Sequence, residues 1–190
     1  MGQQDQGVSN SVRRYKTVPR TLCFVLYGDD VLLIKGAPEK RLWANRYNGV
    51  GGHVEPDEDV CAAALREICE ETGWGDQDVG SLSLRGIINV DAGDPQMGIM
   101  LFVFTARARR RQTRPSAEGT LEWIPRSRLL DYPLVEDLPV LLPRVLALPD
   151  DAPPLFGHYR YDQNDELVMR FDSCDLSGTP ERVIIDTCDL

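Results

Sequence analysis

The sequence predicts an α+β domain in which a mixed β-sheet packs against few helices. Apolar runs short enough for strands outnumber helical segments, and no repeat or long linker divides the 190-residue chain. The composition, 42% hydrophobic and 27% charged, is ordinary for a globular protein with a core of normal size. A chain of this length fits one domain with some extension, or at most two small domains.

The N-terminal half is expected to hold a hairpin, a loop and one helix. Residues 1–15 are polar and are predicted to be a disordered tail. Apolar runs on both sides of a Gly-Asp-Asp turn predict a hairpin over 20–36. After a loop, the glycine-rich segment 47–54 predicts a short strand that enters a special turn. The periodic segment 57–72 predicts a helix, and Gly73 is placed to end it.

The C-terminal half is expected to alternate strands with one more helix. Strands are predicted over 81–90, 98–107 and 121–125. The helical segment 136–148 is expected to be interrupted by Pro139 and Pro143, because proline lacks the backbone donor of the helical ladder. A late hairpin is predicted over 155–171, and residues 173–190 are expected to form a loose tail. The folded domain is therefore expected over 16–172.

Charge and cysteine usage narrow the function classes. The net charge of −9 argues against a general nucleic-acid-binding surface, because such affinity comes largely from phosphate neutralisation. No apolar run approaches the ~20 residues of a membrane span, and the first residues lack the apolar core of a signal peptide. A cytoplasmic location is therefore expected. The five cysteines are scattered without a C-x-x-C pair, so we expect reduced thiols.

The helix predicted over 57–72 concentrates acidic residues. At roughly 100° per residue, Glu67, Glu70 and Glu71 share one side of the helix, separate from its apolar stripe. One interpretation is a solvated acidic face. Such faces usually mix in lysines, however, and the segment has none. Hard cations such as Mg²⁺ prefer carboxylate oxygens, so metal binding would relieve the repulsion between these side chains.

The spacing of this segment follows a known motif. It reads Gly52, five residues, Glu58, seven residues, Arg66-Glu67-Ile68, one residue, Glu70-Glu71, one residue, Gly73-Trp74. This resembles the Nudix box, G-x5-E-x7-R-E-U-x-E-E-x-G-U, in which U is a bulky apolar residue. The fixed residues all match, which by chance has a probability on the order of 10⁻⁸ at one starting point. Trp74 departs from the usual aliphatic residue but is also bulky and apolar.

The resemblance implies an α/β/α sandwich built on a mixed β-sheet. It also implies hydrolysis of a nucleoside diphosphate linked to another moiety, with Mg²⁺ or Mn²⁺ as cofactor. Glu67 and Glu71 would be the principal metal ligands, and Glu70 would bind the metal directly or through water. The carbonyl of Gly51 would complete the metal site. Arg66 would orient Glu67 and offset its charge.

Further residues of the box would shape the site. Glu58 would support the turn between loop and helix, while Gly52 and Gly73 would be needed for the backbone path. Glu70, Glu71 or a glutamate outside the box would accept the proton of the attacking water. Glu118 occupies a place where relatives often supply that outside glutamate; the alternative is an exposed loop acid.

Segments outside the box resemble MutT-type enzymes, including oxidised-purine nucleoside triphosphatases, over roughly residues 20–172. This resemblance implies that Asn48 touches the base, unless it is only a strand-end residue. Glu136 and Asp137 would form an acidic pair that binds the base, although such residues also simply start helices. Lys35 is a candidate phosphate contact, with a solvated lysine as the alternative.

Two basic features complete the candidate residues. His53 stands where relatives often carry lysine and is either a phosphate donor or a surface histidine. The dense basic run 107–114 either receives phosphates or an RNA end, or forms a solvated loop between strands.

The leading functional expectation is Mg²⁺-dependent hydrolysis of a nucleoside triphosphate, with oxidised purines among the substrates, to a monophosphate and pyrophosphate. Two alternatives stay open: hydrolysis of ADP-ribose, a dinucleotide or an RNA 5′ end, and a non-catalytic nucleotide sensor with the same fold. The expected partner is a small nucleotide, with neither a membrane nor nucleic acid, and a homodimer stays open.

Overall fold

The computed structural model describes residues 14–116, 118–172 and 181–185. Most of the predicted N-terminal tail (1–15) and most of the predicted C-terminal tail (173–190) lie outside these residues. Among the described helices, none is both long enough and apolar enough to cross a membrane. Cys23, Cys61 and Cys69 are free thiols, as expected, and the other two cysteines lie outside the described residues.

In the described part of the chain, nine β-strands alternate with two α-helices and two short 3-10 segments. The strands are β1 (Lys16–Tyr27), β2 (Asp30–Gly36), β3 (Tyr47–Asn48), β4 (Val79–Asp94), β5 (Met97–Ala108), β6 (Gly119–Pro125), β7 (Leu155–Tyr161), β8 (Leu167–Asp172) and β9 (Glu181–Ile185). The helices are α1 (Val60–Thr72) and α2 (Leu138–Ala147), and the short 3-10 segments are η2 (Asp76–Asp78) and η3 (Arg126–Asp131).

The strands form one nine-stranded mixed sheet. Its order is β3-β2-β1-β5-β4-β7-β8-β9, and β6 pairs with β2 off this path. The pairs β1–β5 and β4–β7 are parallel, and the other paired strands run antiparallel. The mixed sheet predicted from the sequence is thereby confirmed.

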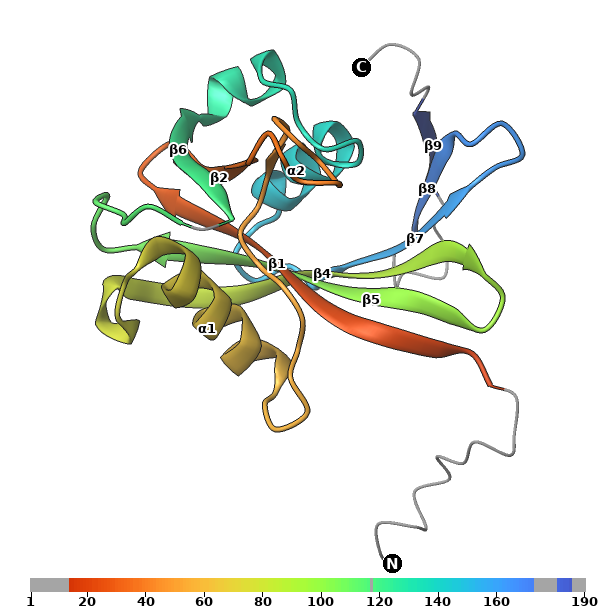
Figure 1. Ribbon diagram of the computed structural model, residues 1–190, viewed down its shortest axis with the longest axis horizontal. Coiled ribbons are helices and arrows are strands. Elements are labelled where there is room, and N and C mark those ends of the chain that lie inside the picture. Colours follow the sequence, from red (N-terminus) through yellow and green to blue (C-terminus); the bar gives the residue numbers. More distant parts are fainter. Residues whose placement is uncertain (1–13, 117, 173–180, 186–190) are drawn as a thin grey trace, which may run out of the picture.

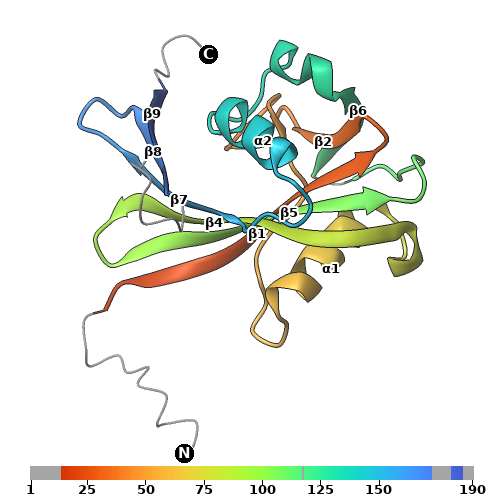
Figure 2. The same ribbon diagram turned by 180° about the vertical axis from the view of Figure 1, so that it is seen from behind.

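The helices cover opposite faces of the sheet. Figures 1 and 2 show α1 on one face and α2 on the other, with both ends of the sheet rising toward the α2 side. Strand β1 contributes side chains to the hydrophobic cores on both faces of the sheet. Its residues Phe24 and Leu26 pack in the cluster that contains the buried side of α2, while Cys23 and Val25 pack in the cluster around α1. A central strand buried on both faces needs such a continuous apolar run.

The helix α1 begins three residues later than the sequence predicted. Asp59 caps it, because its carboxylate accepts from the backbone N–H groups of Cys61 (2.8 Å) and Ala62 (3.0 Å). The preceding acidic residues form a loop in which the Glu55 N–H donates to Glu58. The end of the helix agrees with the prediction, since Gly73 adopts a left-handed conformation and bonds to the Cys69 carbonyl.

The predicted interruption of α2 by prolines is wrong. Pro139 lies in the first turn, where its missing N–H has no helical partner to lose. Pro143 lies inside the helix and removes one bond of the ladder. The helix nevertheless continues because it is held by a wholly buried side, formed by Leu138, Leu141, Leu142 and Val145.

The C-terminal region differs from the expected loose tail. The late hairpin is confirmed as β7 and β8, joined by a turn in which the Asp165 N–H donates to the Asp162 carbonyl. Beyond it, β9 pairs antiparallel with β8 and extends the sheet. This strand was not predicted, because its five residues include only three apolar ones in a polar context.

Candidate active site

The loop before α1 is fastened to β1 by backbone hydrogen bonds. The Cys23 N–H donates to the Val50 carbonyl (2.7 Å), and the Thr21 N–H donates to the Gly52 carbonyl (2.8 Å). A side chain on Gly51, whose φ is +148°, would collide with the Thr21 carbonyl. One on Gly52 would collide with the carboxylate of Glu67. Glycines therefore allow the loop to approach both β1 and α1 closely.

Arg66 gathers the acidic side chains of the box around one guanidinium. It bonds both carboxylate oxygens of Glu58 (2.6 and 3.1 Å). It also donates to Glu67 (2.9 Å), Glu70 (3.3 Å) and the carbonyl of His53 (2.9 Å). The hydrogen bonds from Arg66, and to a lesser extent the one from the Glu55 N–H, lower the pKa of Glu58. This network explains how a helix with so many carboxylates avoids self-repulsion.

Glu71 is the most deeply buried carboxylate of the box, with 8% of its surface exposed. Its Oε1 accepts from the Gly51 N–H (3.0 Å), while its Oε2 is buried without a hydrogen-bond partner among the described residues. Burial raises the pKa of Glu71 to about 7. A buried carboxylate oxygen without a partner is costly unless a cation or a proton satisfies it. The donor set therefore fits a hard divalent cation.

The carboxylates do not converge on one point in this structure. Among the described residues, no three Asp, Glu, His or Cys side chains stand in a metal-ligating group. The hydrogen bonds explain this, because Glu67 and Glu70 point to Arg66 while Glu71 points to the Gly51 N–H.

Glu118 lies beside these carboxylates although it is distant in sequence. Both Glu118 and Glu71 line the same cavities, and the charge of Glu118 acts on Glu71. The side chain of Glu118 is 60% exposed and forms an ion pair with Lys40. Lys40 was not predicted as a site residue, because it lies in a loop without a recognisable motif.

A cavity of about 680 Å³ extends from the carboxylates of α1 to the N-terminal end of α2. Eight of the proposed site residues line it: Asn48, Gly51, Glu67, Glu70, Glu71, Glu118, Glu136 and Asp137. Its wall includes apolar side chains from three strands and the segment before α2, namely Leu22, Val90, Ile99, Leu101 and Val135. An apolar cavity with polar groups at both ends is typical of a small-molecule site.

The end of the cavity near α2 carries four hydrogen-bonding side chains. Asp137 immediately precedes α2, and burial raises its pKa to about 7. The Tyr161 hydroxyl donates to Glu136 (3.3 Å). The Tyr159 hydroxyl is buried without a partner among the described residues. Neither tyrosine was proposed from the sequence, because nothing local shows that β7 pairs with β4 beside this cavity.

Asn48 and His53 also face the cavity. The Asn48 amide oxygen accepts from the Gly49 N–H (2.8 Å). This bond leaves the two amide N–H donors of Asn48 for a ligand. His53 is exposed, and its backbone carbonyl rather than its ring is bonded to Arg66.

The structure does not bring Lys35 to the cavity. Its ammonium lies 5.7 Å from the centre of the Tyr47 ring, and Lys35 is absent from the cavity wall. Successive side chains of a strand point to opposite faces. Ile34 faces a small cavity next to Glu71, so Lys35 points away from it.

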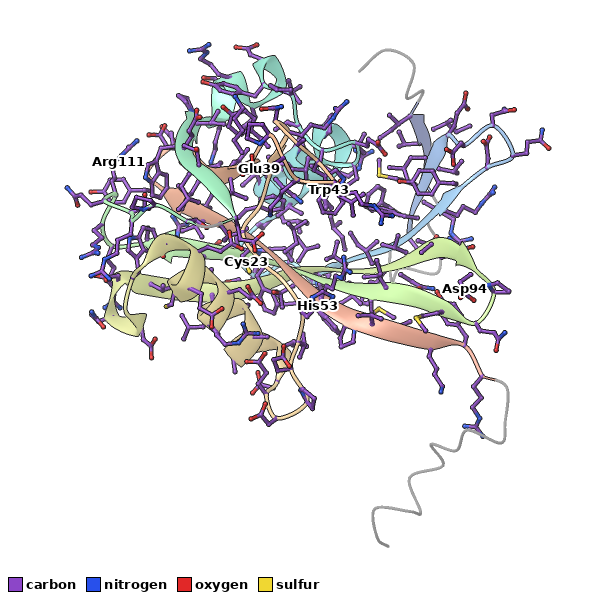
Figure 3. All side chains as sticks on the ribbon, viewed as in Figure 1. Cys23, Glu39, Trp43, His53, Asp94 and Arg111 are labelled. Atoms are coloured by element: carbon purple, nitrogen blue, oxygen red, sulfur yellow. The ribbon has the colours of Figure 1, made fainter. Side chains whose placement is uncertain are left out.

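The basic run 107–114 packs against the end of α1 instead of the cavity. Its backbone carbonyls accept from two indole rings, Gln112 from Trp74 (2.6 Å) and Arg111 from Trp123 (2.9 Å). The Arg111 guanidinium also lies 5.2 Å from the Trp123 ring centre and pairs with Asp30 (2.6 Å). Figure 3 shows Arg111 at one end of the molecule and Asp94, at the tip of the β4–β5 hairpin, at the other. These contacts favour a structural role for Arg111 and Gln112, whereas Arg107 lines a separate, second cavity.

A family model for the NUDIX domain matches residues 16–145, more than half of the chain. The chain therefore belongs to the Nudix family. The α/β/α sandwich predicted from the resemblance is confirmed by both the layers of the fold and this match.

Solved structures show which members of the Nudix family this chain is similar to. A mutator MutT protein from Bacillus halodurans is 28% identical with a TM-score of 0.66, and the match covers 82% of this chain and 97% of that one. The NUDIX domain of Shewanella oneidensis NrtR, complexed with ADP ribose, is 15% identical with a TM-score of 0.57, over 77% and 97%. An ADP-ribose pyrophosphatase from Streptococcus suis is 16% identical with a TM-score of 0.51, over 76% and 98%. The chain is a MutT-like Nudix hydrolase.

Proposed function

We propose that this hydrolase cleaves a purine nucleoside triphosphate, ordinary or oxidised, to a monophosphate and pyrophosphate with Mg²⁺ or Mn²⁺. The observation that carries the proposal is the unpartnered, buried Oε2 of Glu71 at one end of the large cavity. A proton or a cation would satisfy that oxygen, and a divalent metal ion that also binds the phosphate chain would supply the cation.

The metal would be held by the Gly51 carbonyl and by three carboxylates of α1, those of Glu67, Glu70 and Glu71. When bound, the metal neutralises phosphate charge and lowers the pKa of a water molecule. Arg66 has a positioning role. Its hydrogen bonds to Glu58 and Glu67 fix the position of the Glu67 carboxylate. The loop bonded to β1 holds Gly51 against Glu71.

Glu118 is the proposed acceptor of the water's proton. Its carboxylate is exposed at the cavity and lies outside the group bonded to Arg66. Lys40 pairs with Glu118 and holds its carboxylate at the edge of the cavity. Lys40 is also the cation beside Glu71, a position in which it can contact phosphate oxygens.

The purine would occupy the end of the cavity near α2. The apolar wall suits a planar ring, and the surrounding groups offer both donors and acceptors: the Asn48 amide, the carboxyls of Glu136 and Asp137, and the Tyr159 hydroxyl. A base edge that carries both kinds of group can pair with such a set.

The test is a product screen with the full chain. Ordinary and oxidised purine triphosphates, pyrimidine triphosphates, ADP-ribose, a dinucleoside polyphosphate and capped RNA are each incubated with Mg²⁺, with Mn²⁺ and with EDTA. We expect pyrophosphate and a monophosphate from purine triphosphates, only with metal. A higher kcat/KM for ADP-ribose or RNA would overturn the substrate class, and tight binding without turnover would indicate a sensor.

A further inference from the structure

A second cavity, of about 310 Å³, lies at the other end of α2. Asp137, at the start of the helix, lines the large cavity, whereas Val145 and Leu146, near its end, line the second one. A ten-residue helix is roughly 15 Å long, so the two cavities are separated by about that distance. Because Val145 and Leu146 line it, the second cavity lies on the face of the sheet that α2 covers. Figure 2 shows α2 on that face and α1 on the opposite one.

The floor of the second cavity is a polar strip on β4 and β5. Ser83 pairs with Thr105 across these strands, and alternate residues share a face. Ser81 and Arg107 therefore lie on the same face as this pair, and all of them line the cavity. A register shift between Leu84 and Gly86 leaves Arg85 as an extra residue, which lines the cavity too.

Arg85 has a structural explanation. Its side chain, only 7% exposed, donates to the Thr105 hydroxyl (3.1 Å) and the Pro149 carbonyl (2.8 Å). It also donates to the carboxylate of Asp150 (2.9 Å). Arg85 thus binds the segment after α2 to the sheet, and its charge is balanced by Asp150.

Two further arginines of the cavity have no such explanation. The Nε–H of Arg126 is buried without a hydrogen-bond partner among the described residues. Arg107, by contrast, is exposed to solvent, and its side chain forms no hydrogen bond or ion pair within the described part of the chain. Among the described residues of the cavity wall, Asp150 is the only acidic one, and it already pairs with Arg85. A buried unpaired guanidinium donor costs free energy that a bound anion would recover.

We propose that this second cavity binds a phosphate-type anion through Arg107 and Arg126, with the hydroxyls of Ser81 and Ser83 as further donors. The guanidinium fork matches the geometry of a phosphate group, and hydroxyl groups donate to its remaining oxygens. The concentration of positive charge is unusual in a chain with a net charge of −9. Three sources share this chemistry: orthophosphate, pyrophosphate and the phosphate of a nucleoside monophosphate.

The experiment is isothermal calorimetry together with thermal melts of the full chain in EDTA. The probes are orthophosphate, pyrophosphate and adenosine monophosphate, with sulfate, acetate and chloride at equal ionic strength as comparison anions. The variants are Arg126→Gln and Arg107→Gln. The matched control is Arg160→Gln, because Arg160 is an exposed arginine on β7 away from this cavity. Glu67→Gln reports on anion binding at the acidic end of the large cavity.

We expect one of the phosphate probes to bind and to raise the melting midpoint by roughly 3–6 °C at ten times its Kd. Arg126→Gln and Arg107→Gln should each weaken this binding at least tenfold, whereas Arg160→Gln and Glu67→Gln should not. The strongest probe identifies the source. Binding that is absent, equal for acetate and phosphate, or unchanged in both arginine variants would overturn the proposal. Because EDTA is present, the result does not depend on the proposed hydrolysis.

Discussion

The backbone N–H of Gly51 donates to Oε1 of Glu71 over 3.0 Å and joins the loop before α1 to the last turn of that helix. The bond occupies one oxygen of Glu71 and leaves the other buried without a partner. This asymmetry leads to a prediction about metal binding and folding.

Millimolar Mg²⁺ should raise the melting midpoint of the wild-type chain, because a ligand that binds the folded state stabilises it. Glu71→Gln should abolish most of this rise, since the amide carries no charge to attract the cation. Thermal melts at pH 8 with and without Mg²⁺ measure the effect. Asp57→Asn, a change at an exposed acid of the preceding loop, is the matched control and should keep the full rise. An equal rise in wild type and Glu71→Gln would remove Glu71 from the metal site.

The sequence was most informative where a chemical function demands a fixed spacing. The resemblance implies that Arg66 orients Glu67, and in the structure Arg66 donates to Glu67 and to Glu58 in the loop before the helix. Such contacts arise within one loop and one helix, so local sequence is sufficient to predict them.

The sequence was least informative where distant strands meet. Tyr159 reaches the large cavity because β7 pairs in parallel with β4, and Glu118 reaches Lys40 because β6 pairs with β2. Neither pairing leaves a local pattern. The predicted interruption of α2 at Pro143 was wrong for a related reason. Helix propensity is a local property, whereas α2 is stabilised by burial against distant parts of the chain.

Glu67→Gln should lower kcat by roughly 10²–10³-fold while changing KM little, because the carboxylate acts on the metal-bound transition state. The helix should persist, since Gln and Glu have similar helix propensity. Steady-state kinetics with Mg²⁺ measure both constants, and circular dichroism checks the fold. Glu39→Gln, at an exposed loop position, should behave as wild type. Near-normal turnover of Glu67→Gln would make the assignment of this residue wrong.

Asn48→Ala should reduce kcat/KM for the best purine triphosphate by roughly 1–3 kcal/mol, because it removes two donors that face the cavity. A poor pyrimidine substrate should be barely affected. The measurement is kcat/KM for both proteins across ordinary and oxidised nucleotides. A uniform loss over all bases would show that Asn48 only shapes the turn at Gly49.

Tyr159→Phe should have two effects. It should stabilise the protein without ligand, and it should weaken the binding of the purine base. The hydroxyl has no partner in the described chain, so its removal should raise the free energy of unfolding by about 1 kcal/mol. The same change should lower kcat/KM for the purine by a similar amount, provided that the hydroxyl bonds to the base. Denaturant melts and kinetics test the two effects separately. Tyr161→Phe is the matched control, and it should destabilise slightly because its hydroxyl is bonded to Glu136.

Because of the Asp137 carboxyl, the free energy of unfolding should decrease as the pH rises. Burial raises the pKa of this carboxyl to about 7, whereas an unfolded chain has a value near ~3.9. Between these two values the folded state holds the proton and the unfolded state has lost it. Stability therefore falls as the pH rises through this window. The full effect should be roughly 1–4 kcal/mol between pH 4 and pH 8.

Asp137→Asn should remove that part of the pH dependence, because an amide does not titrate. The free energy of unfolding is measured by urea titration at several pH values without metal, for wild type and for the variant. Glu71 has a raised pKa as well, so both curves should still fall with pH, and the difference between them isolates Asp137. Asp131→Asn, at an exposed acid of η3, should reproduce the wild-type curve. Parallel curves for wild type and Asp137→Asn would mean that the Asp137 carboxyl stays ionised in the folded protein.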